Sequence, residues 1–512
     1  MIRDPRTDTF LADHKLRVHA ATRPEHPALV IGKRRVTYGE LDAAADQWAR
    51  MLHGLGVVGG DRVVLALDNG YDAVAGFYGS LRADAIPSIV GTSSRVKRLE
   101  RIAALAAPRV LVTTAKVAQG LSPEATAGLR LVLVDGDPVA GATTLAAALA
   151  ETGASAPRRC SIEPDVAMIS WTTGSTGDPK GVMLTHQNLR NSAAAIASYL
   201  EHGGDEVVLC VLPLSHTYGL FQLLVTHWTG GTLVLEAGFA LAFPILKRLE
   251  ETEATGFAGV PTMFASIVAL KRTEHVDLSR LRYLTNAGYA LPAAHLIRLQ
   301  ELCPRTRIYA MYGQTECTRV CYLPPDQVLV RPSSVGISMP NQEVWIEKED
   351  GSRAAPREVG ELVVRGPNVM KGYWRDPGAT SRALRPGPVL GEVVLHTGDL
   401  FRTDDEGYLY FVARADDIIK TRGEKVAPRE VEEAICVLPD VVETAVVGVA
   451  DPIHGVAVKA VVVTRRGSKV TADDIKRAVF LEVNEIAVPR VVEFVEELPR
   501  SAGGKVLKGE LV

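Results

Sequence analysis

Residues 172–181 read Thr-Thr-Gly-Ser-Thr-Gly-Asp-Pro-Lys-Gly, and seven of these ten residues are glycine, serine or threonine. Glycines let backbone N–H groups approach an anion closely, while hydroxyls and a lysine add further donors. The apolar run Met168–Trp171 before this segment predicts a buried strand, and the pattern from Leu184 onward predicts a helix after it. A strand, a glycine-rich loop and a helix in this order predict an α/β fold whose loop binds a polyphosphate.

The loop differs from the P-loop pattern, Gly-x-x-x-x-Gly-Lys-Ser/Thr. Counted from Gly174, that pattern needs a glycine where Pro179 stands and a hydroxyl where Gly181 stands. Taken alone, the segment is either a phosphate loop of another kind or a surface turn, because short patterns are only hypotheses.

The rest of the chain predicts an α/β protein followed by a smaller α+β region. Thr37-Tyr38-Gly39-Glu40 is a capping-box pattern before a run of helical apolar spacing, and a further helix is expected after Tyr71. Residues 153–164, rich in small residues and proline, predict a connector. From about residue 414 the pattern becomes α+β, with helices opening at Pro428 and after Thr471. Apolar runs predict strands at 61–67, 86–90, 109–112, 131–134, 361–364, 407–412, 445–449 and 460–463.

Composition excludes several classes of protein. The chain has 512 residues and a net charge of -3, which gives no overall electrostatic footprint for nucleic acid or an anionic membrane. It contains no run of about 18 apolar residues, so no membrane span is expected, and residues 1–8 lack the apolar core of a signal peptide, which favours the cytoplasm. Six cysteines are too few for a disulfide scaffold. Cys317 and Cys321 lack a second Cys/His pair and are interpreted as packed thiols.

Further motifs lie at wide intervals after the loop. They are Leu212-Pro213-Leu214-Ser215-His216-Thr217-Tyr218-Gly219, Tyr312-Gly313-Gln314-Thr315-Glu316, Gly360-Glu361-Leu362 with Gly372-Tyr373, His396-Thr397-Gly398-Asp399, Arg414-Ala415-Asp416-Asp417-Ile418-Ile419-Lys420, and Gly503-Gly504-Lys505. In this order they resemble the acyl-adenylate-forming superfamily of acyl-CoA synthetases, stand-alone adenylation enzymes and luciferases. The resemblance covers nearly the whole chain. Each motif alone is weak, and their joint order makes the resemblance specific.

The resemblance implies a reaction and a set of site residues. A carboxylate attacks the α-phosphate of ATP and releases pyrophosphate, so cations and N–H donors must offset the repulsion between two anions. Lys505 would bridge the substrate carboxylate and the α-phosphate, Thr315 would donate to the α-phosphate, Glu316 would help to hold Mg²⁺, and His216 would line the path to the carboxylate. The implied nucleotide-binding residues are Thr172, Thr173, Gly174, Ser175, Thr176, Gly177 and Lys180 for the phosphates, Asn286, Ala287, Gly288, Tyr289, Tyr312 and Gly313 for adenine, Asp399 for the ribose hydroxyls, and Arg414 for ribose or phosphate.

The resemblance also implies a second half-reaction and a division into domains. We expect an N-terminal domain of packed α/β sheets with a small β-barrel-like subdomain at 1–413, a hinge at 414–417 and a small mobile α+β domain at 418–512. The C-terminal domain would rotate about Asp416, and Gly423 would let a pantetheine arm pass close to the backbone. The thiol would belong to CoA or to the phosphopantetheine of a carrier protein.

The segment around His216 also bears on the substrate. Many relatives that activate amino acids place an aspartate near this position to pair with the α-ammonium group, and His216-Thr217 offers none. The sequence therefore favours a small carboxylic acid that is an uncharged acyl or aryl acid, with CoA as acceptor. The alternatives are an enzyme that loads an acyl or peptidyl carrier protein, one that uses an amine acceptor, and a nucleotide sensor without turnover. Tyr289 is bulky where many relatives carry a small residue.

Overall fold

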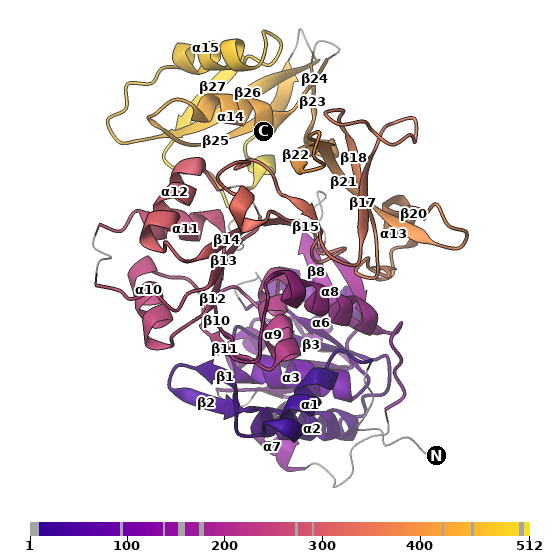
Figure 1. The fold of residues 1–512 in the computed structure, drawn as a ribbon. Coiled ribbons are helices and arrows are strands. Elements are labelled where there is room, and N and C mark those ends of the chain that lie inside the picture. The colour runs from indigo at the N-terminus through magenta and orange to yellow at the C-terminus, as the bar shows by residue number, and fades with distance from the viewer. Residues whose placement is uncertain are drawn as a thin grey trace. The chain divides into compact units, whose positions relative to one another are not determined.

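The computed structural model describes residues 10–92, 96–136, 139–151, 159–173, 179–271, 275–288, 291–421, 424–451, 455–500 and 506–512. Its chain divides into two compact units (Figure 1). The first comprises Met1–Val344 and Val364–Leu395, and the second comprises Trp345–Val363 and His396–Val512. The hinge at 414–417 and the domain boundary drawn there stay predictions.

A nine-stranded sheet forms the centre of the first unit. Its strand order is β16-β15-β14-β13-β12-β10-β11-β1-β2, and the strands from β14 to β1 pair in parallel while β2, β15 and β16 pair antiparallel. The chain passes from β10 to β11 on one side and then continues through β12, β13 and β14 on the other, so the strand order reverses beside β10. The bounds are β1 Pro27–Ile31, β2 Arg34–Thr37, β10 Val207–Cys210, β11 Thr232–Leu235, β12 Gly256–Gly259, β13 Tyr283–Asn286, β14 Arg307–Tyr312, β15 Cys321–Tyr322 and β16 Ile337–Ser338.

A second, fully parallel sheet has the order β4-β3-β5-β6-β7. Its strands are β3 Arg62–Ala66, β4 Ile86–Ile89, β5 Val110–Thr113, β6 Arg130–Leu133 and β7 Ala142–Thr144. The first four confirm the strands expected from the apolar runs at 61–67, 86–90, 109–112 and 131–134. Such runs are apolar without alternation because both faces of a parallel sheet are covered.

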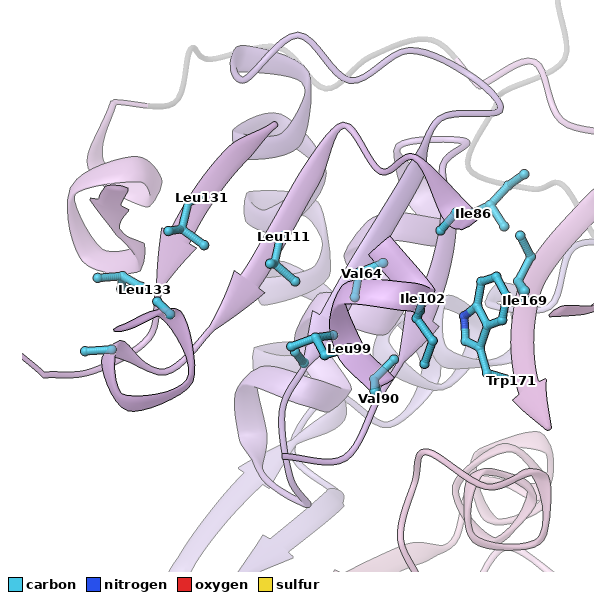
Figure 2. Packing of buried hydrophobic residues seen from close by; sticks show 14 residues of the cluster. Val64, Ile86, Val90, Leu99, Ile102, Leu111, Leu131, Leu133, Ile169 and Trp171 are labelled. Carbon is cyan, nitrogen blue, oxygen red and sulfur yellow. The ribbon is translucent and has the colours of Figure 1, made fainter. Parts of the chain in front are cut away.

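The strand that leads into the phosphate loop packs against this second sheet. Ile169 and Trp171 of β8 (Val166–Thr173) lie in one hydrophobic cluster with Val64, Leu111 and other residues of the sheet (Figure 2). The Trp171 indole donates from Nε1 to Ser88 Oγ at 2.6 Å, which satisfies its buried N–H. The entrance to the loop therefore stands on a buried, hydrogen-bonded support.

The helix predicted from Leu184 onward is present as α8 (His186–Tyr199), but a strand that was not predicted lies between the loop and this helix. Residues on both sides of the loop form an antiparallel hairpin, in which β8 pairs with β9 (Pro179–Thr185) from Val166↔Thr185 to Thr173↔Pro179. The helix begins at His186, after a Thr185 capping box, and Leu184 belongs to the strand. The apolar residues of 182–184 alternate against β8, a partner that the local pattern does not reveal. The loop is thus held between two strands, and no helix N-terminus follows it.

Helices cover the sheets of the first unit. The capping box predicted at Thr37 is present, with Glu40 N donating to Thr37 Oγ1 and Thr37 N donating to the Glu40 carboxylate. The helix expected after Tyr71 is α3. The bounds are α1 His14–Thr22, α2 Tyr38–Gly54, α3 Tyr71–Arg82, α4 Val96–Ala106, α5 Ala115–Gln119, α6 Pro123–Thr126, α7 Leu145–Ala150, α8 His186–Tyr199, α9 Thr217–Thr229, α10 Ala242–Glu251, α11 Pro261–Val268, α12 Ala293–Leu302 and α13 Pro377–Ala383.

The second unit contains the α+β region expected after residue 414. Its sheet β25-β26-β27 carries α14, which opens at Pro428, and α15, which follows a Thr471 capping box, as predicted. The division between the units runs through a further sheet, β17-β18-β21-β20 with β22 paired to β21. The bounds are β17 Glu343–Glu347, β18 Gly360–Arg365, β20 Leu384–Pro386, β21 Val393–Thr403, β22 Leu409–Arg414, β23 Ile419–Thr421, β24 Glu424–Val426, α14 Pro428–Cys436, β25 Val441–Asp451, β26 Gly455–Thr464, α15 Ala472–Glu482 and β27 Val491–Val495.

None of the six cysteines forms a disulfide, and Cys317 and Cys321 are buried. Burial raises the pKa of the Cys321 thiol, so it stays protonated. Within the described ranges, no group of His, Cys, Asp and Glu is arranged to hold a metal ion by itself. Nor does any helix in those ranges have the length and apolar character that crossing a membrane requires.

Candidate active site

The mouth of the phosphate loop lies at the open end of the β8–β9 hairpin. Thr172 of β8 stands opposite Lys180 of β9 in the strand register, and both are half-buried. The backbone of Thr173 pairs with Pro179 at the last rung. Gly174, Ser175, Thr176 and Gly177 lie outside the described residues. The hairpin therefore fixes the two ends of the loop and places a lysine beside it.

Lys180 and Glu316 both contact one tyrosine, Tyr373. Tyr373 of β19 (Gly372–Tyr373) donates from its hydroxyl to Glu316 Oε1 at 2.7 Å. The Lys180 ammonium lies 5.6 Å from the centroid of the Tyr373 ring. Strand β19 reaches this place because it pairs with β9, Tyr373 opposite Val182. Residues that are far apart in the sequence thus form one cluster, which we call the Glu316 cluster: Lys180, Glu316 and Tyr373.

The turn that carries Thr315 and Glu316 is tightly packed at its base. A Cβ atom on Gly313 would lie 2.5 Å from the Thr318 carbonyl oxygen, so only glycine fits there. Thr318 itself adopts a left-handed φ of 65°. Met370 N donates to the Glu316 carbonyl at 2.8 Å, which ties the turn to the segment before β19. Both Thr315 and Glu316 keep half-buried side chains.

The residues assigned to the adenine pocket lie at the carboxyl ends of two neighbouring parallel strands. Asn286 ends β13 with 1% of its surface exposed, and Ala287 and Gly288 follow it. Gly288 has a left-handed φ of 100°, which a residue with a side chain rarely adopts. Tyr312 ends β14, the next strand of the sheet. Tyr289 lies outside the described residues.

His216 lies at the start of α9, in the loop that follows β10. Desolvation, together with the positive charge of Arg98, lowers the pKa of His216, although His216 is exposed on the surface of the unit. Both effects favour the neutral imidazole. A neutral side chain can line the path of an anionic substrate without offsetting the charge of that substrate. The next residue but one, Tyr218, donates from its hydroxyl to the Thr285 carbonyl at 2.9 Å and also reaches the Gly259 carbonyl at 3.3 Å.

The remaining predicted site residues belong to the second unit. Asp399 is buried on β21, opposite Arg414 of β22 in the register, and the Arg414 Nε lies 3.6 Å from Asp399 Oδ1. The Asp399 N–H donates to Thr397 Oγ1, which in turn donates to the Leu362 carbonyl at 2.7 Å. Asp416 is exposed in a short 3-10 turn, Ala415–Asp417. Gly423 and Lys505 lie outside the described residues.

Two family models match this chain. Residues 16–374 match the AMP-binding enzyme model, and residues 430–505 match the model of the AMP-binding enzyme C-terminal domain. The chain belongs to the AMP-binding enzyme family. It is therefore an acyl-adenylate-forming enzyme, an AMP-forming acid–thiol ligase that uses ATP to activate a small carboxylic acid.

Relatives along the whole chain agree with this membership. The enzyme is 34% identical over 495 residues to a feruloyl-CoA synthase of an Amycolatopsis species, which covers 96% of both chains. It is 30% identical over 525 residues to a long-chain-fatty-acid–CoA ligase of Bacillus subtilis, covering 96% of this chain and 92% of that one. Among solved structures it is similar to ATP-bound MatB of Rhodopseudomonas palustris, with a TM-score of 0.87, 28% identity and 98% of both chains covered.

Sequence reasoning missed two residues that the structure brings to this region. Tyr373 belongs to the motif Gly372-Tyr373, for which the sequence suggested no role, yet its hydroxyl donates to Glu316. Arg319 stands three residues after Glu316 and is buried. One sequence feature could have indicated the burial of Arg319. This charged residue directly precedes the apolar run Val320-Cys321-Tyr322-Leu323, which is typical of a buried strand.

Proposed function

We propose that the described site residues bind ATP for the adenylation step. In the first unit the hairpin would hold the β- and γ-phosphates through Thr172, Lys180 and the loop between them. Tyr312 and the segment 286–288 would bind adenine. In the second unit Asp399 would accept hydrogen bonds from the ribose hydroxyls, for which a carboxylate is suited. The observation that carries this proposal is the Glu316 cluster, which joins a lysine and a carboxylate beside the phosphate loop.

The Glu316 cluster also fits Mg²⁺. Magnesium prefers oxygen ligands and is usually bound by one or two carboxylates together with substrate phosphates. Tyr373 donates to one carboxylate oxygen of Glu316, Oε1, and so orients the carboxylate. Glu316 would thus offer an oriented oxygen to the ion, which would offset the negative charge of the phosphates.

Lys505 would supply the transition-state contact. As the family resemblance implies, its ammonium would bridge the attacking carboxylate and the α-phosphate, where negative charge accumulates. A donor of this kind is typically worth about a hundred- to a thousandfold in rate. Thr315 would donate to the same phosphate, and His216, whose pKa is lowered by desolvation, would line the entry of the acid.

Coenzyme A is the acceptor that the relatives support, because their names are those of CoA ligases. After adenylation, rotation about Asp416 would present Gly423 and its neighbours to the pantetheine arm. The names of the relatives include an aryl acid and long-chain fatty acids, so both classes belong in a substrate screen. Loading of a carrier protein remains the second candidate, since its phosphopantetheine presents the same thiol arm.

The test of the proposed function is product analysis. The enzyme is incubated with ATP, Mg²⁺, a panel of acids and either CoA or a holo-carrier protein, and AMP and acyl thioesters are quantified by mass spectrometry. The proposal expects AMP and acyl-CoA in equal amounts. If the holo-carrier is acylated with a higher kcat/KM than CoA, the carrier protein and not CoA is the acceptor. AMP formation without any thioester would contradict the proposed second half-reaction.

A further inference from the structure

Arg319 is a buried cation for which the described residues supply no counter-ion. Its side chain is 3% exposed, and no carboxylate in the described ranges pairs with it. Its Nη1 donates to the Met311 sulfur at 2.7 Å, and a thioether is a weak acceptor. Its Nε is enclosed and has no hydrogen-bond partner. Arginine stays protonated in proteins, and a buried charge without a partner is strongly destabilising. Such a group indicates an anionic ligand.

The contacts of Arg319 place it where ligands bind in sheets of this kind. Its guanidinium lies 5.0 Å from the centroid of the Tyr218 ring. The Tyr218 hydroxyl lies at the carboxyl ends of β12 and β13, where it contacts Gly259 and Thr285. Met311, the acceptor of Nη1, is the penultimate residue of β14. In open α/β sheets, ligands bind outside the carboxyl ends of the strands, near the point where the strand order reverses.

Arg319 also follows the Glu316 turn directly, so it is close to the reaction in sequence as well as in the sheet. The guanidinium lies over the Tyr218 ring, and an oxyanion would bind to its N–H groups. A carboxylate matches the planar guanidinium through two parallel hydrogen bonds. The tyrosine beneath it offers an aromatic face that stabilises the cation without neutralising it.

We propose that Arg319 binds a second carboxylate of the acid substrate, so that the enzyme activates one end of a dicarboxylic acid while the guanidinium holds the other. The proposal rests on the proposed function, in which the reacting carboxylate meets ATP. That reacting carboxylate loses its charge when it becomes the mixed anhydride, whereas a distal carboxylate keeps its charge through both half-reactions. A fixed buried cation suits the group that stays charged, since binding the reacting group equally well in the ground state adds nothing to kcat. This revises the expectation of an otherwise uncharged acid.

The test compares dicarboxylic acids with their own monomethyl esters. ATP–pyrophosphate exchange is measured with aliphatic diacids of increasing length and with benzene dicarboxylic acids, each beside the ester that removes one charge at similar volume. For the diacid that fits, kcat/KM exceeds that of its ester by about a hundredfold or more, because the ester leaves the buried arginine unpaired. Arg319→Met brings this ratio close to one, and Arg319→Lys, a point charge without the planar fork, gives an intermediate ratio.

Thermal unfolding separates a ligand site from a structural role. If Arg319 only supported the fold, replacing it would lower the stability of the protein. Replacing an unpaired buried charge by an apolar residue of similar volume does not lower that stability. Arg319→Met should therefore leave the melting temperature without ligand at or above that of the wild type. Arg282→Met is the matched control, because Arg282 is hydrogen-bonded to buried Glu206, and it should lower the melting temperature.

The outcomes distinguish the two proposals. If diacids and esters exchange equally well, the Arg319 assignment is overturned and the proposed function stands. If no acid supports exchange, the proposed function fails, and the role of Arg319 is then tested by the binding of diacids in thermal melts. A diacid should raise the melting temperature of the wild type more than its ester does, and should lose this advantage with Arg319→Met; the absence of any such difference in the wild type overturns the assignment.

Discussion

Replacing Tyr373 by phenylalanine tests the Glu316 cluster most sharply. The change removes one hydroxyl, which donates to Glu316 Oε1 at 2.7 Å, and retains the ring beside Lys180. Hydrogen bonds to charged groups contribute about 1.5–3 kcal/mol. Since about 1.4 kcal/mol corresponds to a factor of ten in rate, the loss of orientation at Glu316 should lower the adenylation rate by about 10- to 150-fold.

The assay is acid-dependent ATP–pyrophosphate exchange, measured at fixed ATP over a range of Mg²⁺ concentrations. If Glu316 helps to hold the ion, the defect is largest at low Mg²⁺ and shrinks as Mg²⁺ rises. Stabilisation of the protein by ATP and Mg²⁺ in a thermal melt should weaken in parallel, which gives a readout apart from turnover.

The matched control is Tyr410→Phe. Tyr410 also donates from its hydroxyl to a carboxylate, Asp404 Oδ2 at 3.1 Å, in the β21–β22 hairpin. This variant removes the same atom from the same kind of bond and should exchange within about twofold of the wild type. A Tyr373→Phe enzyme with wild-type rate and wild-type Mg²⁺ dependence would refute the reasoning.

Three further predictions concern stability and the hinge. Burial lowers the pKa of His227 to about 4, so protonation of His227 favours the unfolded chain. As the pH falls from 6.5 to 4, this group should lower the free energy of unfolding, measured in urea, by about 3 kcal/mol. A free energy of unfolding that does not change over this pH range would contradict the prediction. In Gly79→Ala the new Cβ would lie 2.2 Å from Trp48 Cβ, so a loss of about 3 kcal/mol is expected in urea unfolding, whereas Gly54→Ala, with open space, should cost nothing. Asp416→Pro fixes φ in the proposed hinge; it should leave pyrophosphate exchange measurable and slow thioester formation, and equal loss of both steps would argue against a hinge.

Local sequence rules were sufficient where an element is determined by its own residues. The capping box at Thr37, the threonine at 471 and the proline at 428 marked helix starts that the structure contains. The parallel strands of the second sheet were visible as short apolar runs, because both of their faces are buried. These features need no knowledge of distant partners.

The rest depended on pairing between distant segments. β9 is a strand because it lies between β8 and β19, and Gly372-Tyr373 is almost two hundred residues away along the chain. The contact of Tyr373 with Glu316 follows from that same pairing, so no local pattern could assign it a role. Arg319 shows the same limit for a charge, since its burial against Tyr218 results from the tertiary packing of α9 and β14.

The family motifs predicted more of the site residues than the local residue chemistry did. They named Lys180 and Glu316 separately, and the structure brings both to Tyr373. The assignments of Gly174, Gly423 and Lys505 fall outside the described residues and stay predictions.

The central claim is that this chain makes an acyl-adenylate with Lys505 at the reacting carboxylate. Acid-dependent ATP–pyrophosphate exchange in the wild type and in Lys505→Ala tests it most directly, with ATP binding measured in both. The account predicts exchange that requires an acid, and its loss in Lys505→Ala by about a hundred- to a thousandfold while ATP still binds. Exchange that is unimpaired in Lys505→Ala, or absent from the wild type with every acid of the panel, would contradict it.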